Sequence, residues 1–501
     1  MDTAEFRKYG KEMVDIIADY YENVNNMPPK STVKPGYLYK LMPREIPEDP
    51  EPFEDIKRDI ETKIMPGMTH WQSGNFFGWF PSTNSFPSML GDMCTNMFDI
   101  VGFNWTCSPA ATELETVVMD WLGKLIGLNK RFLSFSEDGT EAAGGGVILG
   151  SASEAQIVAM TAARERMVAH LISQGICAEE AERMKSRFVV YGSDQTHFAT
   201  QKDARIVGCK MHAVVSDENF RLTKEALEAA IEEDKNAGLV PFFVCGTFGT
   251  TNTTAIDDLP GIADVAALEN MWFHVDAAYA GAALACPEFW PLAVGIEHAD
   301  SFSFSPHKWM LTSLNMTTMW VANSMHLSNS LGMSCEYFLR VKGDRAFVRD
   351  YCDWQLSLGR RFRALKLWFV LRMHGASGIQ KHIRTHVSQA KWLEDQLLAD
   401  GRFEMMAPTL FGLVVFRIKP QILVDSSMAP AYGKENCAKI NAINNELINR
   451  IQDDNRVFLV GTNIKGHDVI RVAVGSTLGS HRNIELLVQV LKQVTTEIIG
   501  N

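Results

Sequence analysis

The first twenty residues alternate apolar and polar positions with the period of an α-helix. The apolar residues recur at intervals of three and four, at Phe6, Tyr9, Met13, Ile16 and Tyr20. This spacing predicts an amphipathic helix with a single apolar stripe, which needs a surface to cover it. We interpret the helix as part of an N-terminal arm laid over a partner subunit. Packing of the helix on its own domain is the alternative.

The stretch that follows is rich in proline, at positions 28, 29, 35, 43, 47, 50 and 52. Proline removes a backbone donor and restricts the residue before it, so we expect an extended stretch that forms no compact unit by itself. Residues 1–84 are therefore predicted to be a helical arm and dimerisation segment.

Short apolar runs alternate with helical patterns between residues 85 and 374. Strands are expected at 188–191, 213–215, 241–245, 272–275, 301–304 and 317–321. Helices are expected at 153–167, 224–234 and 262–269. This alternation predicts a large α/β domain whose mostly parallel sheet is covered by helices on both faces. Such folds bind ligands beyond the carboxyl ends of their strands.

The pattern changes again after residue 374. A long helical stretch precedes a strand at 412–417, a helix at 435–453, a strand at 469–474 and a last helix from about residue 483. Residues 375–501 are therefore predicted to form a small C-terminal α+β domain.

Composition favours an enzyme over a binding module. The 501 residues, 46% hydrophobic and 22% charged, can bury a large core. The net charge of −12 disfavours nucleic acid as a partner, and each apolar stretch is shorter than a membrane span.

The N-terminus lacks the pattern of a signal peptide, so a cytoplasmic location is expected. The nine cysteines are scattered without zinc spacing, so no metal site is expected.

Two residues at the predicted carboxyl ends of strands indicate a cofactor. Asp276 follows the apolar run 271–275, and Lys308 lies thirty-two residues later in the run 305–309. A lysine amine can hold the aldehyde of pyridoxal phosphate (PLP) as a Schiff base, while a buried carboxylate keeps the pyridine nitrogen protonated. The spacing suits two neighbouring parallel strands joined by a crossover helix.

A glycine-rich segment is the candidate phosphate site. Residues 144–146 are glycines, and the run 150–154 reads Gly-Ser-Ala-Ser-Glu. Glycines let a backbone approach a ligand closely, and a helix that begins at serine offers free N–H groups to an anion. The segment is neither GxGxxG nor a Walker A loop, so it does not indicate a dinucleotide or a nucleoside triphosphate.

Several segments together carry a resemblance to a known family. They are residues 109–115, 144–154, 194–197, 274–280 and 306–309. These segments resemble the PLP-dependent aromatic L-amino-acid decarboxylases, in the group II decarboxylase family, and the resemblance runs over nearly the whole chain. It implies a fold-type I enzyme with PLP as cofactor, an aromatic amino acid as substrate, and an obligate homodimer with active sites at the subunit interface.

The resemblance also implies roles for single residues. Lys308 is similar to the family's Schiff-base lysine, Asp276 to the partner of the pyridine nitrogen, Ala278 to a residue under the ring, and His197 to a catalytic histidine stacked on its other face. Further cofactor contacts are implied for Ala152, Ser153, Thr251, His307 and Ser305. Many relatives carry asparagine in place of Ser305, so a phosphate contact there stays open.

A tyrosine on a mobile loop protonates the substrate carbon in this family, and Tyr337 occupies the matching place. Gly332 and Gly343 are candidate hinges for such a lid. Relatives with phenylalanine at the loop position, or asparagine at the stacked histidine, tend to release an aldehyde, ammonia and peroxide. Because this chain has both Tyr337 and His197, we predict an amine product.

The substrate pocket is also assigned by resemblance. Its implied wall consists of Trp71, Trp79, Phe80, Pro81, Ser82 and Phe103. Relatives with serine at the position of Gly359 favour phenolic substrates or imidazole, whereas glycine leaves room for an indole. The bulk of Trp79, where a smaller aromatic residue is common, opposes large rings. We expect tryptophan and other indolic substrates, with tyrosine, DOPA and phenylalanine as alternatives.

Other functions remain as alternatives. They are an aromatic acetaldehyde synthase, a histidine decarboxylase, an aminotransferase and a catalytically inactive interaction protein. No arginine is clearly placed as the α-carboxylate clamp of an aminotransferase, and an inactive protein would not need the lysine, aspartate, histidine and tyrosine together.

Overall fold

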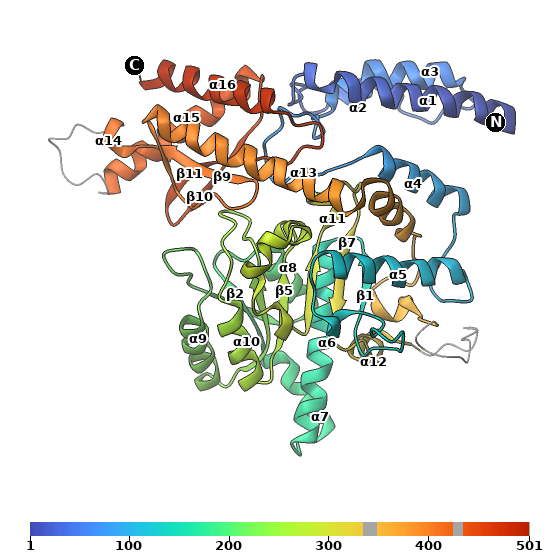
Figure 1. Ribbon diagram of the computed structural model, residues 1–501, viewed down its shortest axis with the longest axis vertical. Coiled ribbons are helices and arrows are strands. Elements are labelled where there is room, and N and C mark those ends of the chain that lie inside the picture. The colour runs from blue at the N-terminus through green and yellow to red at the C-terminus, as the bar shows by residue number, and fades with distance from the viewer. Residues whose placement is uncertain (334–347, 424–433, 500–501) are drawn as a thin grey trace. The chain divides into compact units, whose positions relative to one another are not determined.

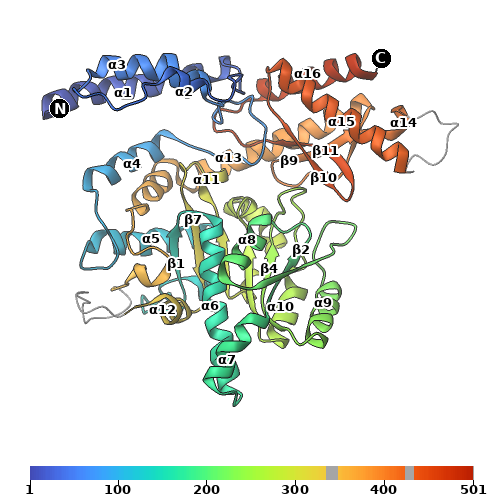
Figure 2. The same ribbon diagram turned by 180° about the vertical axis from the view of Figure 1, so that it is seen from behind.

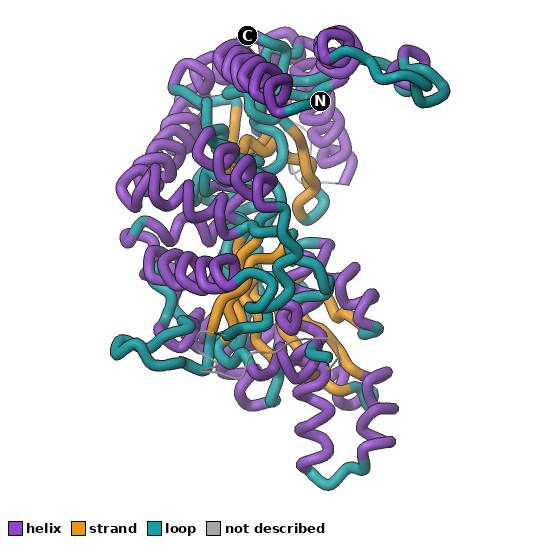
Figure 3. Tube along the Cα trace, turned by 90° about the vertical axis from the view of Figure 1, so that its right-hand side faces the viewer, coloured by secondary structure: helices purple, strands orange, loops and turns teal. Residues whose placement is uncertain are grey.

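The computed structural model describes residues 1–333, 348–423 and 434–499. These residues form two compact units, one made of residues 82–388 and the other of residues 1–81 with 389–501. Figure 3 shows that each unit has its own group of strands with helices around it. The two-unit division places the first and last segments of the chain together, and the functional division at residues 84 and 374 stays a prediction.

The unit formed by residues 82–388 contains a seven-stranded sheet (Figure 1). Its strands are β1 (Gly145–Leu149), β2 (Phe188–Ser193), β3 (Lys210–Val214), β4 (Val240–Thr247), β5 (Trp272–Asp276), β6 (Ser301–Phe304) and β7 (Thr317–Val321). Their order is β1-β7-β6-β5-β4-β2-β3. The strands from β6 to β3 are parallel, while β7 runs antiparallel to both β6 and β1. The predicted mostly parallel α/β sheet is confirmed.

Helices cover both faces of this sheet. Helices α6 (Ala152–Ser173) and α8 (Phe198–Val207) pack against each other, and α6 crosses the face seen in Figure 2. Helices α9 (Lys224–Asn236) and α10 (Leu259–Leu268) contact β4, and right-handed crossovers place them on the opposite face. Two buried faces explain why every residue of β2 and β5 is buried and why β2 is apolar along nearly its whole length.

Strand β1 differs from the sequence interpretation, which placed the glycine triplet in a phosphate loop. Gly145 and Gly146 instead begin β1, which pairs with β7. A side chain at Gly146 would collide with Met119 and Trp320, so glycine is needed for close packing there. Only the turn at Gly150 and Ser151 remains as a candidate loop for phosphate.

The crossover from β5 to β6 also differs from the predicted helix. Three 3₁₀ helices make it: η6 (Ala280–Ala285), η7 (Pro287–Ala293) and η8 (Ile296–His298). Pro291 lies inside η7, and Gly281 packs so closely on Phe304 that a side chain would not fit. Proline and close backbone packing together explain why no α-helix forms here.

Further helices complete this unit. They are α4 (Phe86–Phe98), α5 (Pro109–Leu125), α7 (Ala178–Met184), α11 (Pro306–Trp309), α12 (Met325–Leu331) and the first part of α13 (Ala364–Asp400). The backbone of α13 is interrupted at Gly375, where φ is 62° and ψ is 174°. Glycine tolerates this positive φ, so α13 is two helices joined at a kink, and the second of them is the long helical stretch predicted after residue 374.

The other unit contains a four-stranded antiparallel sheet of order β10-β11-β9-β8. The strands are β8 (Phe403–Met405), β9 (Leu413–Ile418), β10 (Val460–Ile464) and β11 (His467–Ala473). The helices that follow residue 400 are α14 (Pro420–Leu423), α15 (Lys434–Asp454) and α16 (His481–Ile499). Strands β9 and β11 and helices α15 and α16 match the expected α+β pattern, whereas the short strands β8 and β10 were not expected.

The N-terminal segment forms helices in the same unit. They are α1 (Thr3–Asn23), α2 (Tyr37–Leu41) and α3 (Phe53–Asp59). Asp2 caps α1 through hydrogen bonds from the N–H groups of Ala4 and Glu5. Phe6 is 68% exposed, whereas Tyr9, Met13, Ile16 and Tyr20 are each partly buried, so most of the apolar stripe of α1 is partly covered within its own chain. No helix among the residues that the structure describes is both long and apolar enough to cross a membrane.

Candidate active site

Asp276 is the last residue of β5, and both of its carboxylate oxygens accept hydrogen bonds. The backbone N–H of Ala278 donates to Oδ1 at 2.9 Å, and Nε2 of Gln156 donates to Oδ2 at 2.8 Å. Asp276 is 5% exposed. Two donors stabilise a negative charge on Asp276, which is the form that a carboxylate needs to pair with a protonated ring nitrogen.

Lys308 lies in the same part of the unit as Asp276. It belongs to α11, just after β6, and the N–H of Ser305 before this helix donates to the carbonyl of Ala278 at 3.0 Å. Desolvation lowers the pKa of Lys308, and attraction to Asp276 opposes this change. A lowered pKa increases the fraction of neutral amine, which is the form that attacks an aldehyde.

His197 is the third group of this cluster. Its Nδ1 accepts the N–H of Ala199 at 3.2 Å and so caps the start of α8. Desolvation lowers the pKa of His197, with smaller and opposite effects from Asp276 and Lys308. The ring is therefore neutral near pH 7 and carries its proton on Nε2.

The N-terminus of α6 supplies a group of a different kind. Ser151 caps this helix by accepting the N–H of Glu154 at 3.1 Å, which leaves Ala152 and Ser153 in the first turn. N–H groups in a first turn favour an anion such as phosphate. A buried carboxylate, a lysine with a lowered pKa and a capped helix N-terminus match the ring nitrogen, aldehyde and phosphate of PLP.

The remaining predicted cofactor residues lie on segments next to those of Lys308 and His197 in the chain or in contact with them. The hydroxyl of Ser305 is 2.8 Å from Thr317 Oγ1 on β7, which gives it a protein partner. The ring of His307 is held by the backbone of Met316, and burial lowers its pKa to about 4. Thr251 lies in the loop after β4, where the neighbouring Asn252 donates to Gln195, two residues before His197.

Two residues near Asp276 were missed by the sequence analysis. Gln156 supplies a donor to Asp276, and Asp203 on α8 interacts electrostatically with the same carboxylate. The position of Gln156, three residues after Ser153 on one helix face, was a signal that could have found it. Asp203 had no such signal, because an aspartate in a polar helical run is usually solvated.

Some of the predicted pocket residues, Ser82, Phe103 and Gly359, lie in the same unit as the cofactor cluster. Thr83, next to Ser82, donates its N–H to the carbonyl of His307 at 2.9 Å. Gly102, next to Phe103, donates to the carbonyl of Arg360 at 3.1 Å, which brings the segments of Phe103 and Gly359 together. A Cβ atom at Gly359 would have one neighbour, Val101 Cγ1 at 3.5 Å, so the space beside this glycine is open.

The other predicted wall residues belong to the unit formed by residues 1–81 and 389–501. Trp71 and Trp79 are stacked, with ring centroids 5.2 Å apart and planes inclined by 14°. The guanidinium of Arg471 lies 5.2 Å from the ring centroid of Phe80. Pro81 packs directly on Gly475. Tyr337 lies outside the described residues.

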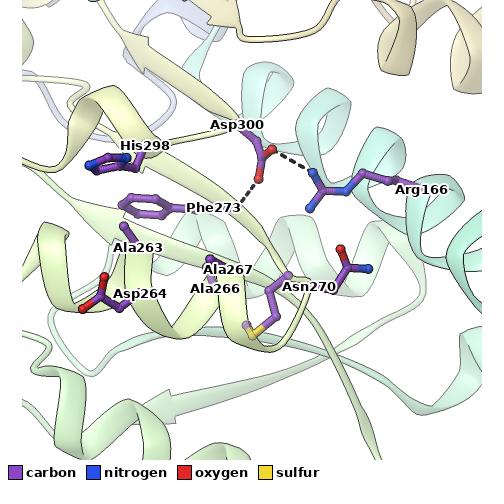
Figure 4. Close-up of a pocket in the computed structure, with 10 residues that line it drawn as sticks. Arg166, Ala263, Asp264, Ala266, Ala267, Asn270, Phe273, His298 and Asp300 are labelled. Atoms are coloured by element: carbon purple, nitrogen blue, oxygen red, sulfur yellow. Dashed lines mark hydrogen bonds and ion pairs between the residues drawn. The ribbon is translucent and has the colours of Figure 1, made fainter.

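A separate cavity of about 320 Å³ lies at the amino-terminal ends of β5 and β6 (Figure 4). Asp276 and Lys308 follow the carboxyl-terminal ends of the same strands. Arg166 Nη1 pairs with Asp300 Oδ1 at 2.7 Å in its wall, so these two charges balance. The cavity contains none of the predicted site residues. Among the described residues, no group of three or more histidine, cysteine, aspartate or glutamate side chains is arranged to hold a metal ion.

Comparisons with known proteins agree with this arrangement. Residues 35–419 match the pyridoxal-dependent decarboxylase conserved domain. The aromatic-L-amino-acid decarboxylase of Mus musculus is 42% identical over 499 residues, covering 100% of this chain and 99% of the relative. The phenylacetaldehyde synthase of a Rosa hybrid cultivar is 44% identical over 495 residues, covering 97% of this chain and 92% of the relative.

Solved structures show the same relationship. The crystal structure of Oryza sativa TDC with PLP and tryptamine superposes with a TM-score of 0.91 at 38% identity, covering 100% of this chain and 99% of that chain. The domain match and the full-length identities establish fold, family and cofactor together. The chain therefore belongs to the pyridoxal-dependent decarboxylase family and is a carboxy-lyase that uses pyridoxal phosphate.

Proposed function

We propose that this enzyme converts aromatic L-amino acids to arylalkylamines and CO2, with tryptophan and other indolic amino acids as preferred substrates. The observation that carries the proposal is the cluster of Asp276, Lys308 and His197 at the carboxyl ends of the parallel strands. The aromatic-L-amino-acid decarboxylase of the mouse, similar over its full length, supports the substrate class.

Each residue of the cluster has a separate task. PLP, when bound, supplies a ring that accepts the electron pair released as CO2 leaves. Lys308 provides the amine for covalent attachment, and Asp276 holds a proton at the pyridine nitrogen. His197 orients the substrate carboxylate and takes part in proton movement near neutral pH. Ala152 and Ser153 contact the phosphate from the first turn of α6.

The preference for an indole rests on Gly359. The space that a side chain would fill there is open, and Val101 forms its nearest boundary. A glycine supplies no hydroxyl partner, so it cannot select a phenolic substrate through a hydrogen bond. Trp71, Trp79, Phe80, Pro81, Ser82 and Phe103 are proposed to complete the aromatic wall.

The amine product rests on His197 together with Tyr337, which we propose returns a proton to the substrate carbon. The alternative is an aromatic acetaldehyde synthase, and the similar phenylacetaldehyde synthase of rose gives it weight. Purified enzyme with PLP should be incubated with tryptophan, tyrosine, DOPA, phenylalanine and histidine, while amine, aldehyde and peroxide are measured together. Amine without peroxide supports the proposal, whereas equimolar aldehyde and peroxide would establish the alternative.

We also propose that the enzyme is a cytoplasmic homodimer with active sites at the subunit interface. Helix α4 exposes an apolar face at Phe86, Leu90, Met93 and Met97, which are 43–68% exposed. Such a face on a helix favours burial against another chain. Sedimentation of wild type and Met93→Asp tests this point, because a charge at the interface should shift the protein toward monomer.

A further inference from the structure

An acidic side chain with an unusual environment lies beside the cofactor cluster. Asp203 on α8 has no exposed surface, and neither carboxylate oxygen has a hydrogen-bond partner among the described residues. Oε1 of Gln156, on the adjoining helix α6, is also buried and has no hydrogen-bond partner among the described residues. Buried polar groups are normally hydrogen-bonded. The carboxylate of Asp203 and the amide oxygen of Gln156 both lack a donor, and both residues interact with Asp276, so this arrangement requires an explanation.

Burial accounts for the chemical state of Asp203. Desolvation raises its pKa to about 7, and the negative charge of Asp276 adds to the rise. Lys202 and the hydroxyl of Ser153 oppose it, although Ser153 does not reach hydrogen-bonding geometry. Two carboxylates that share a poorly solvated site do not both ionise easily. Because Asp276 receives two hydrogen bonds and Asp203 receives none, the proton belongs on Asp203.

We propose that Asp203 is a positioning residue that is a neutral carboxylic acid when PLP binds, and that Asp203 and Gln156 together leave Asp276 as the one negative carboxylate behind the cofactor ring. A protonated Asp203 becomes a donor, which is what an orphaned acceptor such as Gln156 Oε1 needs. Gln156 in turn holds Asp276 through its Nε2 group. The proposal takes PLP as the cofactor and adds a residue to its site.

Ionisation of Asp203 would weaken the binding of PLP. Ser153 is close enough to affect Asp203, and the first turn of α6 is the proposed phosphate site. Ionised Asp203 would place a second negative charge near both Asp276 and the phosphate, which opposes binding. Affinity for PLP should therefore fall as the pH rises through about 7.

Other charged and titratable groups around Asp203 and Asp276 are placed on several elements. They are Lys202 on α8, Cys245 on β4, His274 on β5, His197 at the start of α8 and Lys308 on α11. Burial raises the pKa of Cys245 and lowers those of His197 and His274, so all three are neutral near pH 7. These three groups therefore keep their charge near pH 7, whereas Asp203, with a pKa of about 7, changes its charge in that range.

The test compares PLP binding by apoenzymes of wild type and Asp203→Asn between about pH 6 and about pH 8.5. Asparagine keeps the shape and removes the ionisation. The wild-type dissociation constant should rise relative to that of the variant by about tenfold across this range, and the two should agree within about twofold at the acidic end. Ionisation of PLP itself cancels in this ratio. An unchanged ratio at every pH overturns the proposal.

Asp120→Asn is the matched control. Asp120, on α5, is also a buried aspartate of the same unit, and its carboxylate accepts the N–H groups of Ser134 and Phe135. Its variant should keep the wild-type pH dependence of PLP binding. If the control variant also loses that dependence, the effect is general to buried aspartates and the assignment to Asp203 is wrong.

A second measurement does not depend on PLP binding by a variant. Infrared spectra of apoenzyme with ¹³C-labelled aspartate should show a protonated carboxyl band near pH 6 that disappears by about pH 8.5. Burial also raises the pKa of Asp257 to about 7, so the part of the band that belongs to Asp203 is the part that Asp203→Asn lacks. Absence of such a band contradicts the proposal even if Asp203→Asn does not fold. Failure of wild type to bind PLP at any pH would instead reject the cofactor itself, so the two failures are distinguishable.

Discussion

Nδ1 of His197 accepts the backbone N–H of Ala199 at 3.2 Å, so the proposed catalytic histidine is also the cap of helix α8. One ring nitrogen is thereby occupied by the fold, and the other is left for chemistry. The cap fixes the tautomer, because an accepting Nδ1 requires the proton of the neutral ring to be on Nε2. A substitution at this position therefore changes both a helix end and a reactive group.

His197→Asn and His197→Ala should separate these two contributions. Asparagine is a good N-cap, so His197→Asn should unfold in urea near the wild-type midpoint, whereas His197→Ala should lose about 1 kcal/mol of stability. Both should lower the rate of amine formation by about 10²-fold or more, because neither side chain can exchange a proton. By resemblance to aldehyde-forming relatives, His197→Asn should also raise the yield of aldehyde and peroxide. Normal amine formation by either variant would contradict the role of His197.

Replacement of Lys308 tests the attachment of the cofactor. Lys308→Ala should still fold, but its rate of amine formation should fall by about 10³-fold or more because the attacking amine is gone. Borohydride reduction of wild-type holoenzyme followed by peptide mapping should label Lys308. Lys366 is a useful internal control, because burial lowers its pKa as well. Label on Lys366 in place of Lys308 would refute the assignment.

Gly359→Ser tests the substrate preference. The nearest atom to the new Cβ would be Val101 Cγ1 at 3.5 Å, so the serine fits without displacement of its neighbours. The ratio of kcat/KM for tryptophan to that for tyrosine should fall by about tenfold, because the hydroxyl narrows the pocket and adds a polar partner. Gly359→Ala is the control that adds bulk without a hydroxyl. An unchanged ratio in Gly359→Ser would show that this position does not line the substrate site.

The raised pKa of Asp203 predicts how stability depends on pH. The ordinary value is 3.8 and the folded value about 7, so between these values the folded protein holds a proton that the unfolded chain has released. The contribution of Asp203 to stability is complete below about pH 4 and is lost as the pH rises to about 7. Urea unfolding of the apoenzymes should show Asp203→Asn gaining about 3 kcal/mol relative to wild type between pH 4.5 and pH 7.5. A constant difference would contradict the shift.

Much of the fold follows from the sequence pattern, because parallel strands covered on both faces are continuous apolar runs. Strand β7 occupies the predicted residues, Thr317–Val321, and β5 extends the predicted run by one residue to Asp276. Helix α9 begins at Lys224 as predicted, where Thr223 accepts the N–H of Ala226 as its cap. The position of Asp276 and Lys308 after neighbouring strands was predictable for the same reason.

The features that the pattern did not predict depend on contacts between distant residues. Gly145 and Gly146 indicated a loop, and only their packing against Met119 and Trp320 explains why they form a strand. The 3₁₀ crossover depends on the approach of Gly281 to Phe304, which is not visible in local spacing. Asp203 is a typical surface residue by type, and its burial becomes apparent only when α8 packs on α6.

Helix α6 also sets a distance within the site. Ser153, in its first turn, and Gln156 are three residues apart, which corresponds to about 4.5 Å along a helix axis. The helix therefore fixes the spacing between the proposed phosphate site in its first turn and the side chain that holds Asp276, the proposed partner of the ring nitrogen. One residue inserted between them would turn Gln156 by about 100° around the axis and point its amide away from Asp276.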